Sequence, residues 1–153
     1  MIEIFLPSLK DNLMVNHISV YPLEKLSKHT EIKPGFAFRS EEFLENTSEI
    51  PLVKGENLQQ GYIDWSAAKY WSSDKTRGVE DYFLVENDIV VAMDRPWVTS
   101  GLKWSYIRKG DPKSLLVQRV ARLRAKGKLN QYFLRYLIGS EISLDHINHS
   151  VIH

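Results

Sequence analysis

The sequence of 153 residues contains no cysteine and no run of 18 apolar residues. Without cysteine, disulfides and thiolate chemistry are excluded, and the composition fits a reducing compartment. Without a long apolar run, no membrane-spanning helix is predicted. The first residues, Met1 to Leu6, have neither a basic region nor a long apolar segment, so no secretory signal is predicted. We therefore expect a cytoplasmic protein that does not contact a membrane.

The sequence also lacks the motifs that accompany common enzyme chemistry. It has no glycine-rich phosphate loop, no Gly-x-Gly-x-x-Gly and no adenine-methyltransferase site resembling Asn-Pro-Pro-Tyr. Glu31 and Lys33 match the end of a nuclease Glu-x-Lys pattern, but the acidic partner that should precede them is missing. His146 and His149 have a spacing that zinc can use, yet no third ligand is near. We expect a non-catalytic protein with no cofactor and no metal, and a small nuclease using Glu31 and Lys33 stays a distant alternative.

The charges that are present are unevenly distributed along the chain. The formal net charge is only +1, but the range 103–128 holds nine basic side chains and a single acid, Asp111. The range 41–56 is the reverse, with five glutamates and one lysine. Such an imbalance predicts that one surface attracts a polyanion while another is free for different contacts.

The order of predicted elements places strands first and helices last. Strands are expected at 50–54, 89–93, 102–107 and 115–123. Ser40 is a candidate N-cap of a short helix, apolar residues from 129 to 138 have helical spacing ending at Gly139, and a second short helix is expected at 144–149. The expected fold class is α+β: one domain with a twisted mixed or antiparallel sheet, flanked by short helices and helical at its C-terminal end.

A polar loop follows the buried strand at 89–93 and carries residues suited to DNA. Arg95 can form a bidentate contact with a guanine edge or a phosphate, and Trp97 can pack on a sugar or a base step. Asp94 can orient Arg95 or accept a hydrogen bond from a cytosine amine. The alternative is a surface hairpin in which Trp97 covers the core and Asp94 and Arg95 form an ordinary ion pair.

Two further segments combine basic and aromatic or polar residues. In the strand expected at 115–123, alternation places Arg119 on the inward face, which indicates either an edge position or pairing with Asp94 or Asp88, and places Gln118 on the outward face. The range 65–77 interleaves bases with aromatics, as expected for a loop lying in a DNA groove. The alternatives are a solvated charged strand and a mobile loop whose tryptophans pack on the sheet.

Four ordered segments together resemble a known family. They are Pro-Gly-Phe-Ala-Phe-Arg-Ser (34–40), Pro-Leu-Val-Lys-Gly-Glu-Asn-Leu (51–58), Asp-Ile-Val-Val-Ala-Met-Asp-Arg-Pro-Trp (88–97) with Ser-Gly-Leu-Lys (100–103), and Leu-Leu-Val-Gln-Arg-Val-Ala-Arg-Leu (115–123). In this order they resemble the target-recognition domain of type I restriction-modification specificity subunits. The resemblance runs from about residue 20 to residue 147.

The resemblance implies a non-catalytic component of a larger complex. A specificity subunit carries two target-recognition domains, each reading one half of a split site on double-stranded DNA. Methylation (M) subunits bind it and methylate adenine with S-adenosylmethionine, and motor-nuclease (R) subunits join through them. The family's next segment, a Thr-Gly…Val-Pro motif with a spacer helix, does not follow His153. We therefore expect residues 1–153 to be a single recognition domain, the first half of a subunit or a half-sized subunit.

The predicted DNA surface divides into phosphate and base contacts. Phosphate contacts are expected from Lys75, Lys103, Arg108 and Lys109. Base-edge contacts, each worth about 1–3 kcal/mol of discrimination, are expected from a subset of Asn57, Lys69, Arg77, Arg95 and Gln118. The remaining candidates are Lys54, Tyr70, Asp94, Trp97 and Arg119. The main alternative is a protein-interaction domain whose basic face docks an acidic partner without touching DNA.

Overall fold

The computed structural model describes residues 25–94, 97–98 and 101–140 of the chain. These residues form two compact units: one is the range 32–124, and the other combines residues 25–31 with 125–140. The expectations for the first 24 residues, for the helix at 144–149 and for the side chains of Arg95 and Trp97 lie outside the described residues.

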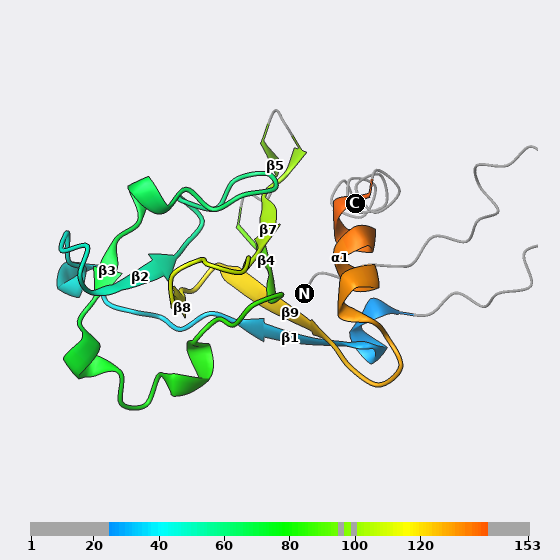
Figure 1. Cartoon of the computed structure of the whole chain (residues 1–153), viewed down its shortest axis with the longest axis horizontal. Helices are drawn as coiled ribbons and strands as arrows, with labels where there is room; N and C mark the ends of the chain where they lie inside the picture. Colours follow the sequence, from blue (N-terminus) through cyan, green and yellow to red (C-terminus); the bar gives the residue numbers. More distant parts are fainter. Residues whose placement is uncertain (1–24, 95–96, 99–100, 141–153) are drawn as a thin grey trace, which may run out of the picture. The chain divides into compact units, whose positions relative to one another are not determined.

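A four-stranded sheet is built around a fully buried central strand. Its order is β1 (Thr30–Pro34), β9 (Val120–Ala125), β4 (Ile89–Ala92) and β7 (Trp104–Tyr106), and Figure 1 shows β9 beside β1. β4 runs antiparallel to both β7 and β9. All four residues of β4 are buried, which explains why its sequence is a continuous β-branched run instead of an alternating one. The strand predicted at 89–93 is confirmed.

A second sheet has mixed strand directions. β2 (Ile50–Val53) lies between β3 (Tyr70–Trp71), to which it is antiparallel, and β8 (Leu115–Leu116), to which it is parallel. A short hairpin pairs β5 (Trp97–Val98) with β6 (Gly101–Leu102). Mixed sheets with little helix confirm the predicted α+β class.

Short 3₁₀ helices occupy the connections between strands. They are η1 (Leu26–Lys28), η2 (Ser40–Glu42), η3 (Trp65–Ala67), η4 (Ser73–Lys75) and η5 (Glu80–Tyr82). The sequence predicted Ser40 as an N-cap, which is wrong: Arg39 is the N-cap of η2, and no side chain caps it. Ser40 lies one position too late to cap the helix, because it is the first residue of η2 itself.

One α-helix closes the described chain. α1 (Gln131–Gly139) begins at an Asn130 cap, whose side-chain oxygen accepts hydrogen bonds from the amides of Tyr132 and Phe133. Its buried residues are Leu134 and Ile138, one turn apart. The predicted helix and its end at Gly139 are confirmed.

Two hydrophobic clusters are formed by described residues of the range 32–124. One is formed by Val53, Leu58, Ile63, Leu84, Val90, Ala92, Ile107, Leu116 and Val120. The other is formed by Phe38, Leu52, Trp71, Val79, Leu115 and Val117. Neighbouring residues of β2 and β8 point into different clusters, so both faces of this sheet are covered and neither strand shows clean alternation.

Two predicted strands are interrupted. The range 115–123 was expected to be one strand, but β8 ends at Leu116 and β9 begins at Val120, with a turn between them. Similarly, the range 102–107 is divided between β6 and β7. In the first case a positive φ of 67° at Arg119 ends the extended conformation, which a sequence pattern of alternating residues does not reveal.

Among the residues that the structure describes, no helix has the length and apolar character needed to cross a bilayer.

Candidate functional site

A groove of about 570 Å³ brings together four separate segments of the range 32–124. Its lining residues come from 38–43, 54–56, 94–103 and 117–119, and they are Phe38, Ser40, Phe43, Lys54, Gly55, Glu56, Asp94, Lys103, Val117, Gln118 and Arg119. Five of them were candidate site residues: Lys54, Asp94, Lys103, Gln118 and Arg119. The groove therefore unites candidates that lie up to 65 positions apart, from 54 to 119.

The turn between β8 and β9 presents Gln118 and Arg119 at the groove. Hydrogen bonds fix its backbone: the Gln118 amide donates to the Phe36 carbonyl at 2.8 Å, and the Arg119 carbonyl accepts from the Met93 amide at 2.8 Å. The chain at Gly35 lies so close that an added Cβ would be 2.1 Å from the Val117 carbonyl oxygen. This contact explains the glycine in the Pro-Gly-Phe segment.

Arg119 is exposed and pairs with Asp94. The guanidinium nitrogen lies 3.0 Å from the carboxylate, and the two side chains are 72% and 53% exposed. The pairing with Asp94 was one of the expected possibilities, but the inward-facing position was wrong. The turn rotates Arg119 out of the alternation, so the cation needs no buried partner.

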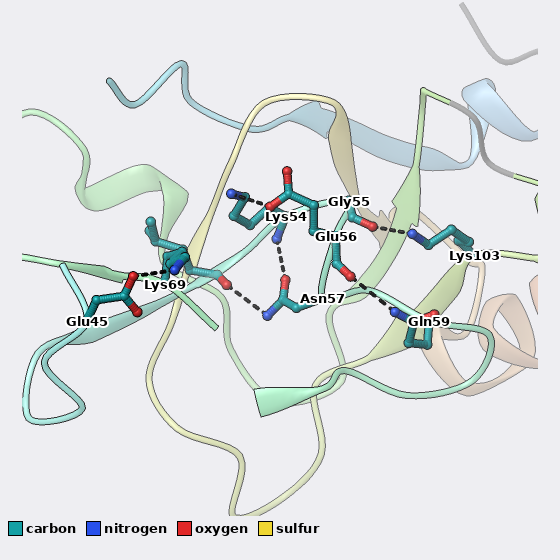
Figure 2. A network of polar contacts seen from close by, with 9 residues as sticks. Glu45, Lys54, Gly55, Glu56, Asn57, Gln59, Lys69 and Lys103 are labelled. Carbon is teal, nitrogen blue, oxygen red and sulfur yellow. Dashed lines mark hydrogen bonds and ion pairs between the residues drawn. The ribbon is translucent and has the colours of Figure 1, made fainter. Parts of the chain in front are cut away.

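The loop after β2 is organised by Asn57 (Figure 2). Its side-chain oxygen accepts from the Lys54 amide at 2.9 Å, and its side-chain nitrogen donates to the Leu52 carbonyl at 3.1 Å. The residue is 0% exposed. The sequence predicted a base contact from Asn57, and the structure corrects this: a side chain with no accessible surface and both amide groups bonded internally shapes the loop instead.

Two lysines reach the groove from either side of that loop. Lys103 donates to the Gly55 carbonyl, and Lys54 pairs with Glu56 at 2.5 Å (Figure 2). Lys54 also lies 4.9 Å from the centre of the Phe43 ring. The ammonium groups are therefore held at defined positions, and Phe38 and Phe43 provide the apolar part of the lining.

Two of the three basic residues of the range 65–77 are joined to the acidic range 41–56. Lys69 pairs with Glu45, and Lys75 pairs with Glu42 at 2.6 Å. The hydrogen bond from Lys75 lowers the pKa of the Glu42 carboxyl below its ordinary value. The folded chain therefore places two glutamates of the acidic range beside lysines from another segment, which partly neutralises the negative charge of that range.

The remaining candidates are spread over the same unit. Arg108 donates to the Gly61 carbonyl at 2.6 Å and stacks 4.7 Å from the Tyr106 ring centre. Arg77 and Lys109 are exposed, and neither has a polar partner among the described residues. Tyr70 is half-buried in β3.

Sequence reasoning missed several groove residues, among them Phe38, Ser40, Phe43 and Glu56. Phe38 and Ser40 stand in the Pro-Gly-Phe-Ala-Phe-Arg-Ser segment, which was used for its resemblance and for a candidate helix cap at Ser40 but not as a binding segment. Within residues 25–94, 97–98 and 101–140, no group of three histidines or acids is placed to hold a metal ion. The groove offers three cations against two carboxylates, with one side-chain amide and two aromatic rings, and this excess of cations suits binding to an anionic polymer.

Comparisons with known proteins point to one kind of subunit. The chain is similar to the type I restriction enzyme EcoAI specificity subunit of Escherichia coli, with 38% identity over 90 residues that make up 59% of this chain and 15% of the relative. It is also similar to the MjaVIII specificity subunit of Methanocaldococcus jannaschii, with 31% identity over 118 residues that make up 76% of this chain and 27% of the relative. No model of a protein family matches.

Solved structures give the same result for the fold. The HsdS subunit from Thermoanaerobacter tengcongensis superposes with a TM-score of 0.51 at 13% identity, covering 77% of this chain and 27% of that one. A chain from a study of type I restriction-modification complex assembly gives 0.53 at 15% identity, again covering 77% and 27%. The resemblance to specificity subunits is thus confirmed, and the chain spans about a quarter or less of the length of the relatives it matches.

Proposed function

We propose that this chain, a relative of type I restriction enzyme specificity subunits, is a non-catalytic domain that reads one half of a bipartite DNA target for a restriction-modification complex. The main support for this proposal is the groove, because it brings together polar and charged side chains from separate segments. They are Lys54, Asp94, Lys103, Gln118 and Arg119. Cations that touch phosphates position a protein on DNA, while amides and carboxylates at the same surface distinguish base edges.

Two cations outside the groove, in the same unit, are further candidate phosphate contacts. Lys109 and Arg77 are exposed and have no polar partner among the described residues, so a phosphate can approach them without displacing an internal bond. Lys69 and Lys75 are different, because each already has a glutamate partner. We therefore rank Lys109 and Arg77 above Lys69 and Lys75 as phosphate contacts.

Salt-dependent binding to duplex DNA tests the proposal. The chain should bind a labelled duplex with a dissociation constant of about 10⁻⁴–10⁻⁶ M for random sequence at physiological salt, more tightly at low salt. Lys109→Ala should lower the slope of log affinity against log salt by about 0.9. Lys28→Ala removes the same charge from the other unit and should leave the slope unchanged. Absence of binding at low salt would refute a DNA-reading function.

A second function, protein interaction, is supported by one observation on α1. Three aromatic residues of this helix are exposed: Tyr132 by 58%, Phe133 by 51% and Tyr136 by 70%. Exposed aromatics grouped on one short element are typical of protein interfaces. We propose this helix as a contact for a methylation subunit, through which a motor-nuclease subunit would join.

The two surfaces are separable by experiment. Tyr136→Ser should weaken co-elution with a methylation subunit and leave duplex affinity unchanged. Lys109→Ala should do the opposite. If Tyr136→Ser lowered duplex affinity as much as Lys109→Ala does, the division into a DNA surface and a protein surface would be wrong.

A further inference from the structure

The turn between β8 and β9 carries Gln118, whose side chain makes no hydrogen bond within the described residues. Gln118 is exposed at the groove, and its amide group has no hydrogen-bond partner among the described residues. The cations that line the same groove are all engaged: Lys54 with Glu56, Lys103 with the Gly55 carbonyl, and Arg119 with Asp94. A free amide among restrained cations can bind a ligand without first breaking a contact.

The backbone that carries Gln118 is held from both sides. Its own amide donates to the Phe36 carbonyl at 2.8 Å, and the preceding Val117 amide donates to the Val53 carbonyl at 3.0 Å. Arg119, the next residue, has a left-handed φ of 67° and is tied back through its carbonyl and its side chain. A backbone fixed in this way presents the side chain without a further loss of backbone entropy on binding, although the side chain itself still loses rotamer freedom.

The chemistry of the amide selects a base pair. A glutamine side chain offers one acceptor and one donor side by side, which complements N6 and N7 of adenine in the major groove. Guanine presents two acceptors at the same edge and suits arginine or lysine better. The cations around Gln118 suit the flanking phosphates, and their existing partners hold them apart from the base edge.

We propose that Gln118 is a specificity-determining residue that reads the adenine of one A·T pair from the major groove. This inference rests on the proposed DNA-reading function. Arg119 and Asp94 act beside it as positioning residues, because their ion pair fixes the end of the turn.

Selection from a randomised duplex pool by the 153-residue chain tests the proposal. Wild-type protein should enrich a short motif that contains at least one A·T pair. Gln118→Ala should enrich the same motif with one of its A·T positions degenerate, and preference at that position should fall by about 5- to 150-fold. Gln118→Glu removes the donor, so adenine preference should be lost there and cytosine, whose amine donates, should gain.

Matched controls separate the possible failures. Gln59→Ala removes a glutamine that does not line the groove and donates to the Glu56 carbonyl, so its motif should equal the wild-type motif. An unchanged motif for Gln118→Ala, with an unchanged melting temperature, overturns the inference alone. Loss of preference at a G·C position instead also overturns it. Binding without any enriched motif, or no binding at all, overturns the proposed function itself.

Discussion

The buried amide of Asn57 allows a demanding test of the groove's architecture. Its two hydrogen bonds, of 2.9 and 3.1 Å, close the loop that carries Lys54, Gly55 and Glu56. Replacement by alanine removes both bonds and leaves the Leu52 carbonyl and the Lys54 amide without their partner. Each buried polar group left unsatisfied costs about 1–3 kcal/mol. Because Leu52 is fully buried and Lys54 only partly, we expect a total of about 2–4 kcal/mol.

Urea denaturation measures this loss directly. With a slope of about 1–3 kcal/mol per molar urea, the midpoint should fall by roughly 1–2 M for Asn57→Ala. Asn46→Ala is the matched control, because Asn46 is exposed and its side chain bonds to nearby Ser48 alone among the described residues. Its loss should cost about 1 kcal/mol or less.

The same variant distinguishes a structural residue from a DNA contact. Asn57→Ala should weaken binding to preferred and random duplexes equally, since it distorts the groove instead of removing a base contact. A loss of stability below about 1 kcal/mol, together with a selective loss of affinity for the preferred duplex, would refute the reasoning and restore Asn57 as a base-reading residue.

Three further predictions follow from contacts elsewhere in the same unit. Asp88→Asn removes the 2%-exposed carboxylate that Arg124 contacts at 2.8 Å. The variant should be about 2–3 kcal/mol less stable in thermal or urea unfolding. This is below the usual cost of breaking a fully buried ion pair, because the Arg124 side chain is one-third exposed. Gly35→Ala should lower the yield of folded protein and its melting temperature, because the new Cβ would meet a backbone carbonyl at 2.1 Å; a fully stable variant would contradict this close approach. The pKa of the Glu42 carboxyl is lowered, first by the hydrogen bond from Lys75. The folded state therefore gains stability above the ordinary pKa of glutamate and loses it as the pH falls through the lowered pKa. Glu42→Gln should flatten the acid side of a plot of stability against pH.

Residue patterns predicted the elements whose formation depends on nearby sequence. The run Ile89–Ala92 became the central strand because a β-branched apolar segment bounded by turn residues has few other favourable states. The apolar spacing before Gly139 became α1 for a similar local reason. Predictions failed where a single backbone dihedral intervened: the positive φ of Arg119 divided one expected strand into two and turned an expected inward arginine outward.

The candidate site was predicted only in part. The sequence drew attention to Lys54, Asp94, Lys103, Gln118 and Arg119, and the structure places all five at one groove. The sequence did not indicate Phe38 and Phe43 as groove residues, since an aromatic residue is assigned to the hydrophobic core until its neighbours are known. It also assigned Asn57 to the surface, because the sequence Gly55-Glu56-Asn57 is typical of an exposed loop.

The sequence alone determined the class of the fold, the relationship to specificity subunits and the excess of cations in the range 103–128. These depend on local propensity, composition and the order of short motifs, which are all properties of the linear sequence. Only the tertiary structure decided which cations are paired, and which side-chain amide lacks a partner among the described residues. Ion pairs such as that of Glu42 with Lys75 join residues 33 positions apart. Which charges remain unpaired on the surface therefore depends on strand pairing across the whole unit. The excess of cations in the range 103–128 therefore suggested a polyanion, while the structure shows that the side-chain amide of Gln118, exposed at the groove, has no hydrogen-bond partner among the described residues.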